Sequence, residues 1–177
     1  MEDDSRQWFA MRDLTRSNAK LPAYRMLEQL QVECFTPMVW KKKQSGGRQV
    51  RELVPAIHDL LFVYSTREAL DPIVDKVRTF QYRYLRNGYR RPMTVRKEEM
   101  NNFIAAVESG GEVRWLRPDE ITPDMYGRRI RIVGGNLDGC EGRLLTVRGS
   151  RKKRMLVELP MLLAAMIEIE SDYIVLL

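Results

Sequence analysis

The stretch IRIVGGNLDGCEGRL, residues 130–144, sets the pattern of the second half of the chain. It begins with alternating apolar and basic residues, which is typical of a strand with one buried face. Gly135 and Gly139 then permit the positive φ angles of a tight turn. Gly142 stands just before the next apolar pair and lets two strands approach closely. The stretch therefore predicts a short strand, a glycine turn and a second short strand.

Short apolar runs separated by Gly, Asp and Asn continue from Tyr126 to the last residue. The expected strands cover residues 130–133, 143–147, 154–159, 167–169 and 173–176. Residues 160–167 are ambiguous between helix and strand, and we interpret them as strand and loop. About five short strands in so few residues predict a small β-barrel, closed so that no sheet edge is exposed.

The first part of the chain alternates between the two hydrophobic periods. The predicted strands cover residues 8–12, 32–40, 50–54, 60–64 and 80–85, and the predicted helices cover 19–31, 67–77 and 96–108. The first helix is expected to be capped by Ser17 or Asn18. The continuous apolar run at 60–64 predicts a central strand buried on both faces. This order predicts a mixed sheet backed by helices, so the fold class is α+β.

The two parts are separated by a stretch rich in Gly, Pro and charged residues. Ser109, Gly110 and Gly111 end the last predicted helix, and the composition of residues 109–124 is that of an interdomain linker. We therefore expect an N-terminal domain over 1–108, a linker over 109–124 and a β-barrel domain over 125–177.

The composition is that of an ordinary globular protein, and the residues show no catalytic or metal-binding pattern. Hydrophobic residues make up 44% and charged residues 31%, as in ordinary globular proteins. No secretory signal or long apolar run is present, so we expect a cytoplasmic location and no membrane contact. Cys34 and Cys140 lack the spacing of a zinc or redox pair. The single histidine, His58, has no neighbour spaced for catalysis, so we expect no enzymatic activity, cofactor or metal.

Positive charge is concentrated in the first two thirds of the chain. Lys plus Arg against Asp plus Glu is 21 against 15 for residues 1–117, and 9 against 9 for residues 118–177. Residues 78–97 hold seven basic residues, no acidic one and three tyrosines. This pattern suits contact with single-stranded DNA through phosphates and stacked bases, the alternative being a solvated basic face. The candidate nucleic-acid-binding residues are Arg78, Arg83, Arg86, Tyr89, Arg90 and Arg91.

Both parts of the chain resemble domains of one known protein family. Residues 130–144 resemble a KOW motif, and the first part resembles the NusG N-terminal (NGN) domain, with the aromatic opening strand at Trp8 and Phe9. The stretch PAIHDLLFV, residues 55–63, lies where that family usually has Pro-apolar-apolar-Pro-Gly-Tyr-Val-Phe-Val. The departure at His58, Asp59 and Leu60 suggests a specialised paralogue, and the chain looks most like the RfaH-like and capsular polysaccharide operon antiterminators. The barrel is then expected to be a five-stranded SH3-like KOW domain.

The resemblance implies a transcription elongation and antitermination factor that binds RNA polymerase at the β′ clamp helices, with the β subunit as a further possible contact. The candidate polymerase-binding residues are Trp8, Phe9, Ile57, His58 and Tyr64. Trp8 and Ile57 are expected to reach the rim of an apolar hollow. The resemblance also implies contact with the non-template DNA strand, and with Rho or a ribosomal protein through the KOW domain. The alternative function is an RNA-binding KOW module.

Lys41, Lys42 and Lys43 are expected at a hairpin tip, as solvated charges.

Overall fold

The computed structural model describes residues 6–109, 111–145, 149–169 and 173–177. The chain forms two compact units, Met1–Arg96 (unit 1) and Lys97–Leu177 (unit 2), each of which is described by itself below. The division falls before the last helix, whereas the sequence pattern placed it after that helix, in the stretch 109–124. Residue 110, within that stretch, lies outside the described residues.

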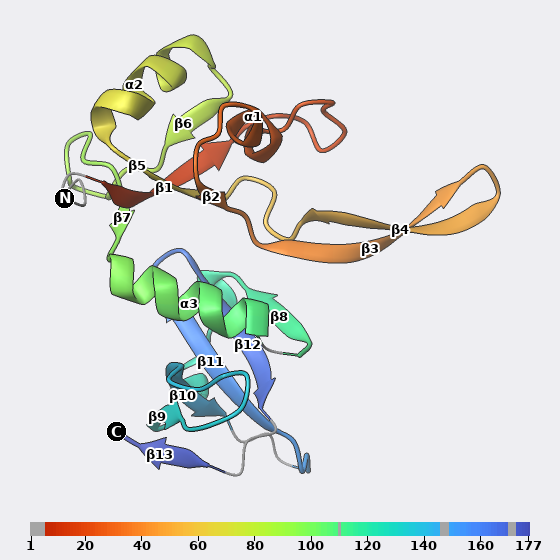
Figure 1. Cartoon of the computed structure of the whole chain (residues 1–177), viewed down its shortest axis with the longest axis vertical. Helices are drawn as coiled ribbons and strands as arrows, with labels where there is room; N and C mark the ends of the chain where they lie inside the picture. Colours follow the sequence, from red (N-terminus) through yellow and green to blue (C-terminus); the bar gives the residue numbers. More distant parts are fainter. Residues whose placement is uncertain (1–5, 110, 146–148, 170–172) are drawn as a thin grey trace. The chain divides into compact units, whose positions relative to one another are not determined.

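The sheet of unit 1 is built around β1 (Gln7–Asp13) (Figure 1). One edge of β1 pairs with β5 (Leu61–Ser65), which in turn pairs with β2 (Cys34–Phe35). The other edge pairs with β6 (Phe80–Tyr82) and with β7 (Thr94–Val95). All of these pairs are antiparallel, so the expectation of a mixed sheet is corrected for the described strands.

Two helices, α1 (Ala23–Gln29) and α2 (Arg67–Lys76), supply buried residues to the core of unit 1. Phe9 and Val63 from the strands share one buried cluster with Leu27 of α1 and Leu70 of α2. Each such side chain contributes roughly 1.5–3 kcal/mol when it leaves water. Leu61, Phe62 and Val63 are consecutive and all buried, which confirms that β5 is buried on both faces.

The start of α1 differs from the expectation. The helix begins at Ala23 rather than near Ala19, and neither Ser17 nor Asn18 caps it. The N–H of Ala23, which has no partner within the helix, instead donates to Oδ2 of Asp13, at 2.8 Å. Oδ1 of Asp13 accepts from the N–H and the hydroxyl of Thr15, at 2.9 and 2.7 Å. Asp13 is 5% exposed. This buried carboxylate at the end of β1 therefore caps the N-terminus of α1, in place of the expected Ser17 or Asn18.

A long hairpin forms a separate two-stranded sheet and projects from unit 1 (Figure 1). Its strands are β3 (Met38–Ser45) and β4 (Arg48–Pro55). Gly46 and Gly47, with φ of 57° and 76°, supply the two-residue turn, whose positive φ angles suit the twist of a hairpin. The three lysines therefore lie within β3, and their expected place at the tip is corrected.

Unit 2 consists of α3 (Lys97–Ser109) and a six-stranded sheet. The strands are β8 (Val113–Leu116), β9 (Arg129–Ile132), β10 (Glu141–Leu145), β11 (Lys153–Leu159), β12 (Leu163–Ile169) and β13 (Ile174–Leu176). Their order is β13-β9-β10-β11-β12-β8, and every pair is antiparallel. The interpretation of residues 160–167 as loop and strand is confirmed. Residues 146 and 147 of an expected strand lie outside the described residues.

Part of the expected linker has regular structure. Residues 113–116 form β8, which pairs with β12 and adds a strand to the five that were expected. Two short 3₁₀ helices, Pro118–Glu120 and Pro123–Met125, follow it. Pro118 and Pro123 therefore begin short helical turns after a sheet strand, within the described part of this stretch.

The glycine turn of unit 2 follows the prediction. Gly135 and Gly139 have φ of 70° and 80°. A Cβ atom on Gly142 would lie 2.6 Å from the carbonyl oxygen of Leu156, so only glycine fits beside β11. Gly127 is packed still more tightly, since its Cβ would lie 1.9 Å from the carbonyl oxygen of Leu144. The sequence pattern did not single out Gly127.

Helix α3 is fixed to the sheet of unit 2, against β11 and β12. The side-chain amide of Asn102 donates to the carbonyl of Glu141 at 2.9 Å and accepts from the N–H of Glu141 at 2.8 Å. The ring of Phe103, which is fully buried, lies 6.0 Å from the ring of Trp115 on β8. Polar and aromatic contacts thus join the last predicted helix to the C-terminal strands.

Candidate functional site

The candidate residues on β1 and β5 lie on opposite faces of one sheet. Trp8 and Tyr64 are direct cross-strand partners, and their ring centroids are 5.2 Å apart. Phe9 points the other way, into the cluster beneath the helices, and is 1% exposed. Trp8 is 4% exposed, so the expectation that it reaches an exposed rim is not met. Of the three, only the half-buried Tyr64 presents part of its side chain to solvent.

Ile57 and His58 lie in the loop between β4 and β5. Ile57 is 7% exposed and so also differs from the expected rim residue. His58 is exposed, and its Nε2 is hydrogen-bonded to the carbonyl oxygen of Thr15. This loop adjoins the end of β5 opposite to that holding Tyr64. The five candidates therefore do not form one patch. Tyr64 and His58 are the accessible residues among them, and the other three are buried in the sheet and the loop.

The basic loop after β6 is the most open of the candidate surfaces. Tyr84 pairs with Pro92 across its base, and Tyr89 is 95% exposed at its end. Its candidates Arg86, Arg90 and Arg91 are exposed, and so is Arg78, which precedes β6 and lies outside this loop. An open loop with arginines beside a solvent-facing ring fits the expected pattern for phosphate contact and base stacking.

Arg83 differs from the other candidate arginines. Its Nη2 lies 3.1 Å from both Oδ2 and the carbonyl oxygen of Asp59. Partial burial lowers the pKa of Arg83, and Asp59 opposes that shift. The side chain therefore ties β6 to the 56–60 loop, and we leave it out of the nucleic-acid surface. No sequence pattern predicts this pairing, because the partners are 24 residues apart.

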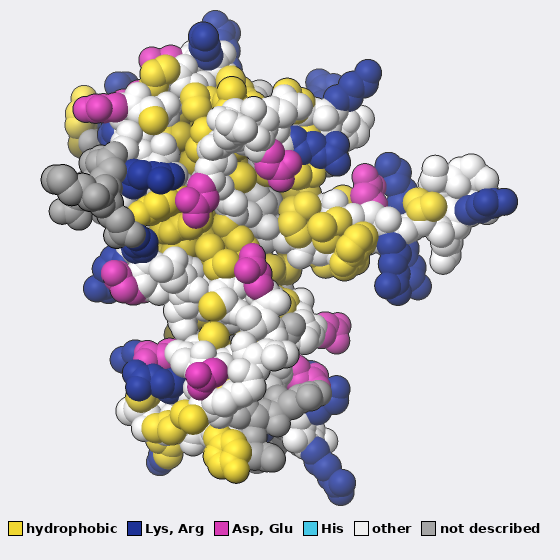
Figure 2. Space-filling view, in the orientation of Figure 1, with side chains coloured by type: hydrophobic (Ala, Val, Ile, Leu, Met, Phe, Trp, Pro, Cys, Tyr) yellow, Lys and Arg dark blue, Asp and Glu magenta, His cyan; other side chains and the backbone are white. Residues whose placement is uncertain are grey.

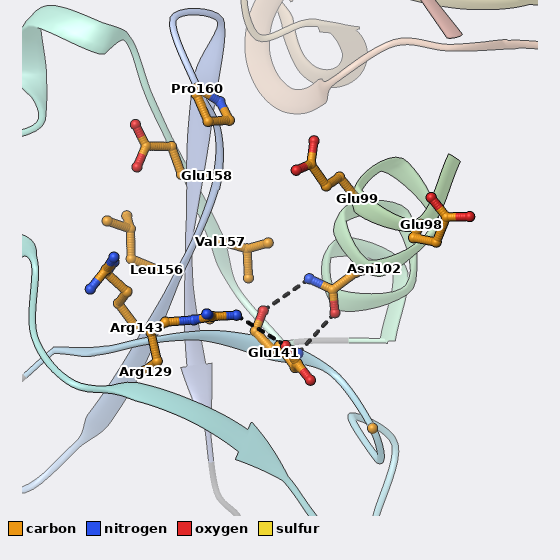
Figure 3. A pocket seen from close by; sticks show the side chains of 12 residues that line it. Glu98, Glu99, Asn102, Arg129, Glu141, Arg143, Leu156, Val157, Glu158 and Pro160 are labelled. Atoms are coloured by element: carbon orange, nitrogen blue, oxygen red, sulfur yellow. Dashed lines mark hydrogen bonds and ion pairs between the residues drawn. The ribbon is translucent and has the colours of Figure 1, made fainter. Parts of the chain in front are cut away.

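Unit 2 contains an open pocket of about 600 Å³ beside α3 (Figure 3). Glu98 and Glu99 of α3 line one side, and Arg129 and Arg143 of the sheet line another. Arg129 pairs with Glu141 at 3.4 Å. Arg143 lies over the ring of Tyr126 and donates to the carbonyl oxygen of Gly127, at 3.2 Å. Both arginines are thus already engaged with neighbouring groups, so we assign no ligand to this pocket.

The cysteines and acidic residues show no arrangement for metal binding in the described part of the chain. Cys34 and Cys140 are free thiols, in unit 1 and unit 2 respectively. Burial and the nearby Glu28 and Glu33 raise the pKa of Cys34 to about 11, which keeps the unreactive thiol form at neutral pH. No helix among the described residues is long and apolar enough to span a membrane.

A comparison with protein families identifies the first part of the chain. The model of the family described as "NusG: Transcription termination factor nusG" matches residues 6–104, more than half of the 177 residues. The chain belongs to the NusG family. It is therefore a transcription factor of the elongation and termination type, and NusG-family proteins generally bind RNA polymerase. The match covers all described residues of unit 1 and ends within α3. No curated protein matches the chain.

Proposed function

We propose that this NusG-family chain binds RNA polymerase and suppresses pausing or termination, without catalysing a reaction. The family match over residues 6–104 carries the proposal. A factor of this kind acts by binding one conformation of its partner more tightly than another, which raises the population of the favoured conformation. Here the favoured conformation is the closed clamp, and the contact is made with the clamp helices of the β′ subunit.

We propose the half-buried Tyr64 as the aromatic contact with these helices. The guanidinium of Arg6 lies 4.6 Å from the centre of the Tyr64 ring, and its Nη2 donates to the Tyr64 carbonyl at 3.0 Å. Buried Trp8, the direct cross-strand partner of Tyr64, packs beside the ring with the two centroids 5.2 Å apart and restricts its position. An aromatic side chain held on a rigid strand loses little entropy on binding, and such residues often dominate binding energy. The exposed His58 is the second proposed contact with RNA polymerase.

A pair of tyrosine variants tests this assignment. Tyr24 on α1 is also half-buried and also has an arginine, Arg25, 5.8 Å from its ring centre. Tyr64→Ala is expected to weaken binding to nuclease-treated RNA polymerase by about tenfold or more, as for an aromatic hot spot, whereas Tyr24→Ala leaves binding nearly unchanged. Equal effects of the two variants on polymerase affinity would refute the role of Tyr64.

The basic loop is the proposed contact with the non-template DNA strand in the transcription bubble. Its exposed residues Arg86, Tyr89, Arg90 and Arg91 can neutralise phosphates and stack on an unpaired base. Changing the three arginines to Gln is expected to reduce crosslinking of the factor to that strand in a reconstituted elongation complex. Changing the exposed Arg16 and Lys20 of unit 1 to Gln is the control for general loss of positive charge.

For unit 2 we propose a KOW-type domain that contacts a second partner, Rho or a ribosomal protein. The glycine turn at 134–139 and the close approach of Gly142 to β11 support this assignment. The loop at His58, Asp59 and Leu60, which differs from the usual family sequence, supports a specialised factor for polysaccharide biosynthesis operons. Transcript profiling after deletion tests the latter: reduced reads restricted to the distal genes of such operons are expected, and a uniform change across all operons would contradict it.

The decisive experiment is transcription in vitro through a terminator, with purified RNA polymerase and with or without the factor. Increased read-through and shorter pauses are expected. The matching binding assay retains polymerase on the immobilised factor after nuclease treatment. If RNA alone is retained, and polymerase is lost when RNA is digested, the chain is an RNA-binding module and the proposal fails.

A further inference from the structure

The hairpin β3/β4 exposes an aromatic and basic face whose composition the fold does not explain. Side chains directly opposite each other in an antiparallel pair lie on the same face. Trp40 opposes Leu53, and Lys42 opposes Arg51, two residues farther along the same face. Gln44 opposes Gln49 beyond them. We call these three pairs the Trp40 face.

Both apolar members of this face are open to solvent. Trp40 is 64% exposed and Leu53 is 42% exposed. The two strands pair with no further strand among the residues that the structure describes. Lysines on an exposed hairpin discourage edge-to-edge aggregation. This explains the charged residues of the hairpin but not its exposed apolar ones. An exposed tryptophan has the opposite effect, so aggregation control does not explain the Trp40 face.

The charges of the Trp40 face are also unfavourable for the hairpin itself. Lys42 and Arg51 are like charges directly opposite each other, an arrangement that destabilises a strand pair. The register places no acidic residue among the six members of this face. On the other face of the hairpin, Lys41 opposes Glu52, and Glu52 also pairs with Lys43 at 3.5 Å. The hairpin thus has one face with an internal counter-charge and one without.

We propose that the Trp40 face binds a single-stranded nucleic acid. Trp40 stacks on an unpaired base, and Lys42 and Arg51 neutralise the adjacent phosphates, which relieves their mutual repulsion. Stacking and charge neutralisation are the usual interactions of single-strand binding, in which a basic surface follows the backbone and aromatic rings stack on the bases. Figure 2 shows Lys and Arg side chains along the projecting hairpin.

A nucleic acid fits this face better than an acidic polypeptide does. An acidic peptide would satisfy Lys42 and Arg51 but has no flat ring to cover Trp40. A duplex would offer phosphates, but its bases are already stacked on one another. This surface is separate from the loop at 84–91 that we propose for the non-template strand, and binding to it requires no polymerase.

The test measures binding of the full-length protein to labelled single strands of about 15 nucleotides, the upper range of single-strand sites. Oligothymidylate and oligouridylate are compared with a duplex of equal length and with polyglutamate. Quenching of tryptophan fluorescence gives a second readout, since Trp40 is exposed whereas Trp8 is buried and Trp115 is half-buried. All variants are also made in the Arg86, Arg90 and Arg91→Gln background, which removes the contribution of the basic loop.

Trp40→Ala is expected to weaken single-strand binding by about tenfold and to abolish the quenching. Lys42→Gln is expected to lower the salt dependence by about 0.7 in slope, the value for one lost phosphate contact on a single strand. Lys41→Gln, on the opposite face, is the matched control and is expected to change neither quantity. A preference for DNA or RNA identifies the source of the strand, and either supports the proposal.

Three results would overturn it: equal effects of Lys41→Gln and Lys42→Gln, equal affinity for duplex or polyglutamate, or no binding in the loop-variant background. Circular dichroism of each variant verifies the fold. Because polymerase is absent from the assay, its outcome is independent of whether the chain suppresses termination.

Discussion

Two antiparallel strand pairs of unit 1 place similar residues in opposite environments. In the pair β1/β5, Phe9 opposes Val63 and both are buried. In the pair β3/β4, Trp40 opposes Leu53 and both are exposed. The backbone ladder is the same in each case, so the ladder does not determine which side chains stabilise the fold. Apolar residues of the first pair hold the unit together, whereas those of the second are available to a partner.

The largest expected effect on stability is the difference between removing the aromatic ring of the buried pair and removing that of the exposed pair. Phe9→Ala is expected to lower the free energy of unfolding by about 3–5 kcal/mol, because it leaves a cavity in a packed core. Trp40→Ala, at an exposed site, is expected to change it by less than about 0.5 kcal/mol. Urea unfolding monitored by circular dichroism measures both values. A cost of several kcal/mol for Trp40→Ala would mean that the hairpin is part of the core, and the comparison would no longer hold.

The next effect concerns the carboxylate that closes β1. Asp13→Ala is expected to cost about 2–3 kcal/mol, because it removes three hydrogen bonds and leaves the N–H of Ala23 without its cap. Glu33→Ala is the control: this carboxylate pairs with Arg6 at 3.7 Å at the surface, where such pairs contribute about 0–1 kcal/mol. If both variants unfold at the same urea concentration, Asp13 has no structural role.

These residues show which parts of the fold could be predicted from sequence. The apolar run at 60–64 predicted a doubly buried strand, since consecutive apolar residues of a strand point to both faces of the sheet and the pattern is local. The turn at Gly135 and Gly139 and the close approach at Gly142 were also predictable, because their signal is local in the sequence. The cap from Asp13 was not, because its partner is ten residues away and a nearer serine offered an ordinary local cap. Contacts over such distances leave no periodic signal.

The same limit applied to the candidate site. The exposed loop with Arg86, Tyr89, Arg90 and Arg91 follows directly from its polar composition. Burial of Trp8 and Ile57 did not, because an aromatic or branched residue near a strand end has the same sequence signal whether it faces a core or a rim. Lys41, Lys42 and Lys43 were placed at a tip, although the glycines that make the turn follow them. A glycine pair outweighs a charge run as a turn signal, because only glycine adopts two positive φ angles readily.

In unit 2 the comparison between packed and open positions can be made with glycines alone. Gly142→Ala is expected to cost about 1–3 kcal/mol, because the added methyl group meets the carbonyl oxygen of Leu156 and the side chain of Met155. Gly111→Ala is the control, since no atom lies within 4 Å of its added Cβ. Thermal unfolding compares the two variants. Equal stability would show that β10 and β11 can separate without loss of the fold.

The smallest expected effect is the most specific to the hairpin. Lys42→Glu replaces a like-charge pair with an opposite-charge pair against Arg51, so it is expected to stabilise the hairpin by about 0.2–1 kcal/mol. Lys41→Glu does the reverse against Glu52 and is expected to destabilise the hairpin by a similar amount. Amide hydrogen exchange of residues 38–55 measures these local changes, since local opening need not follow global unfolding. The stabilising variant is also expected to lose single-strand binding. Slower exchange together with weaker binding would show that the Lys42 and Arg51 pair is retained at a cost to the hairpin's own stability.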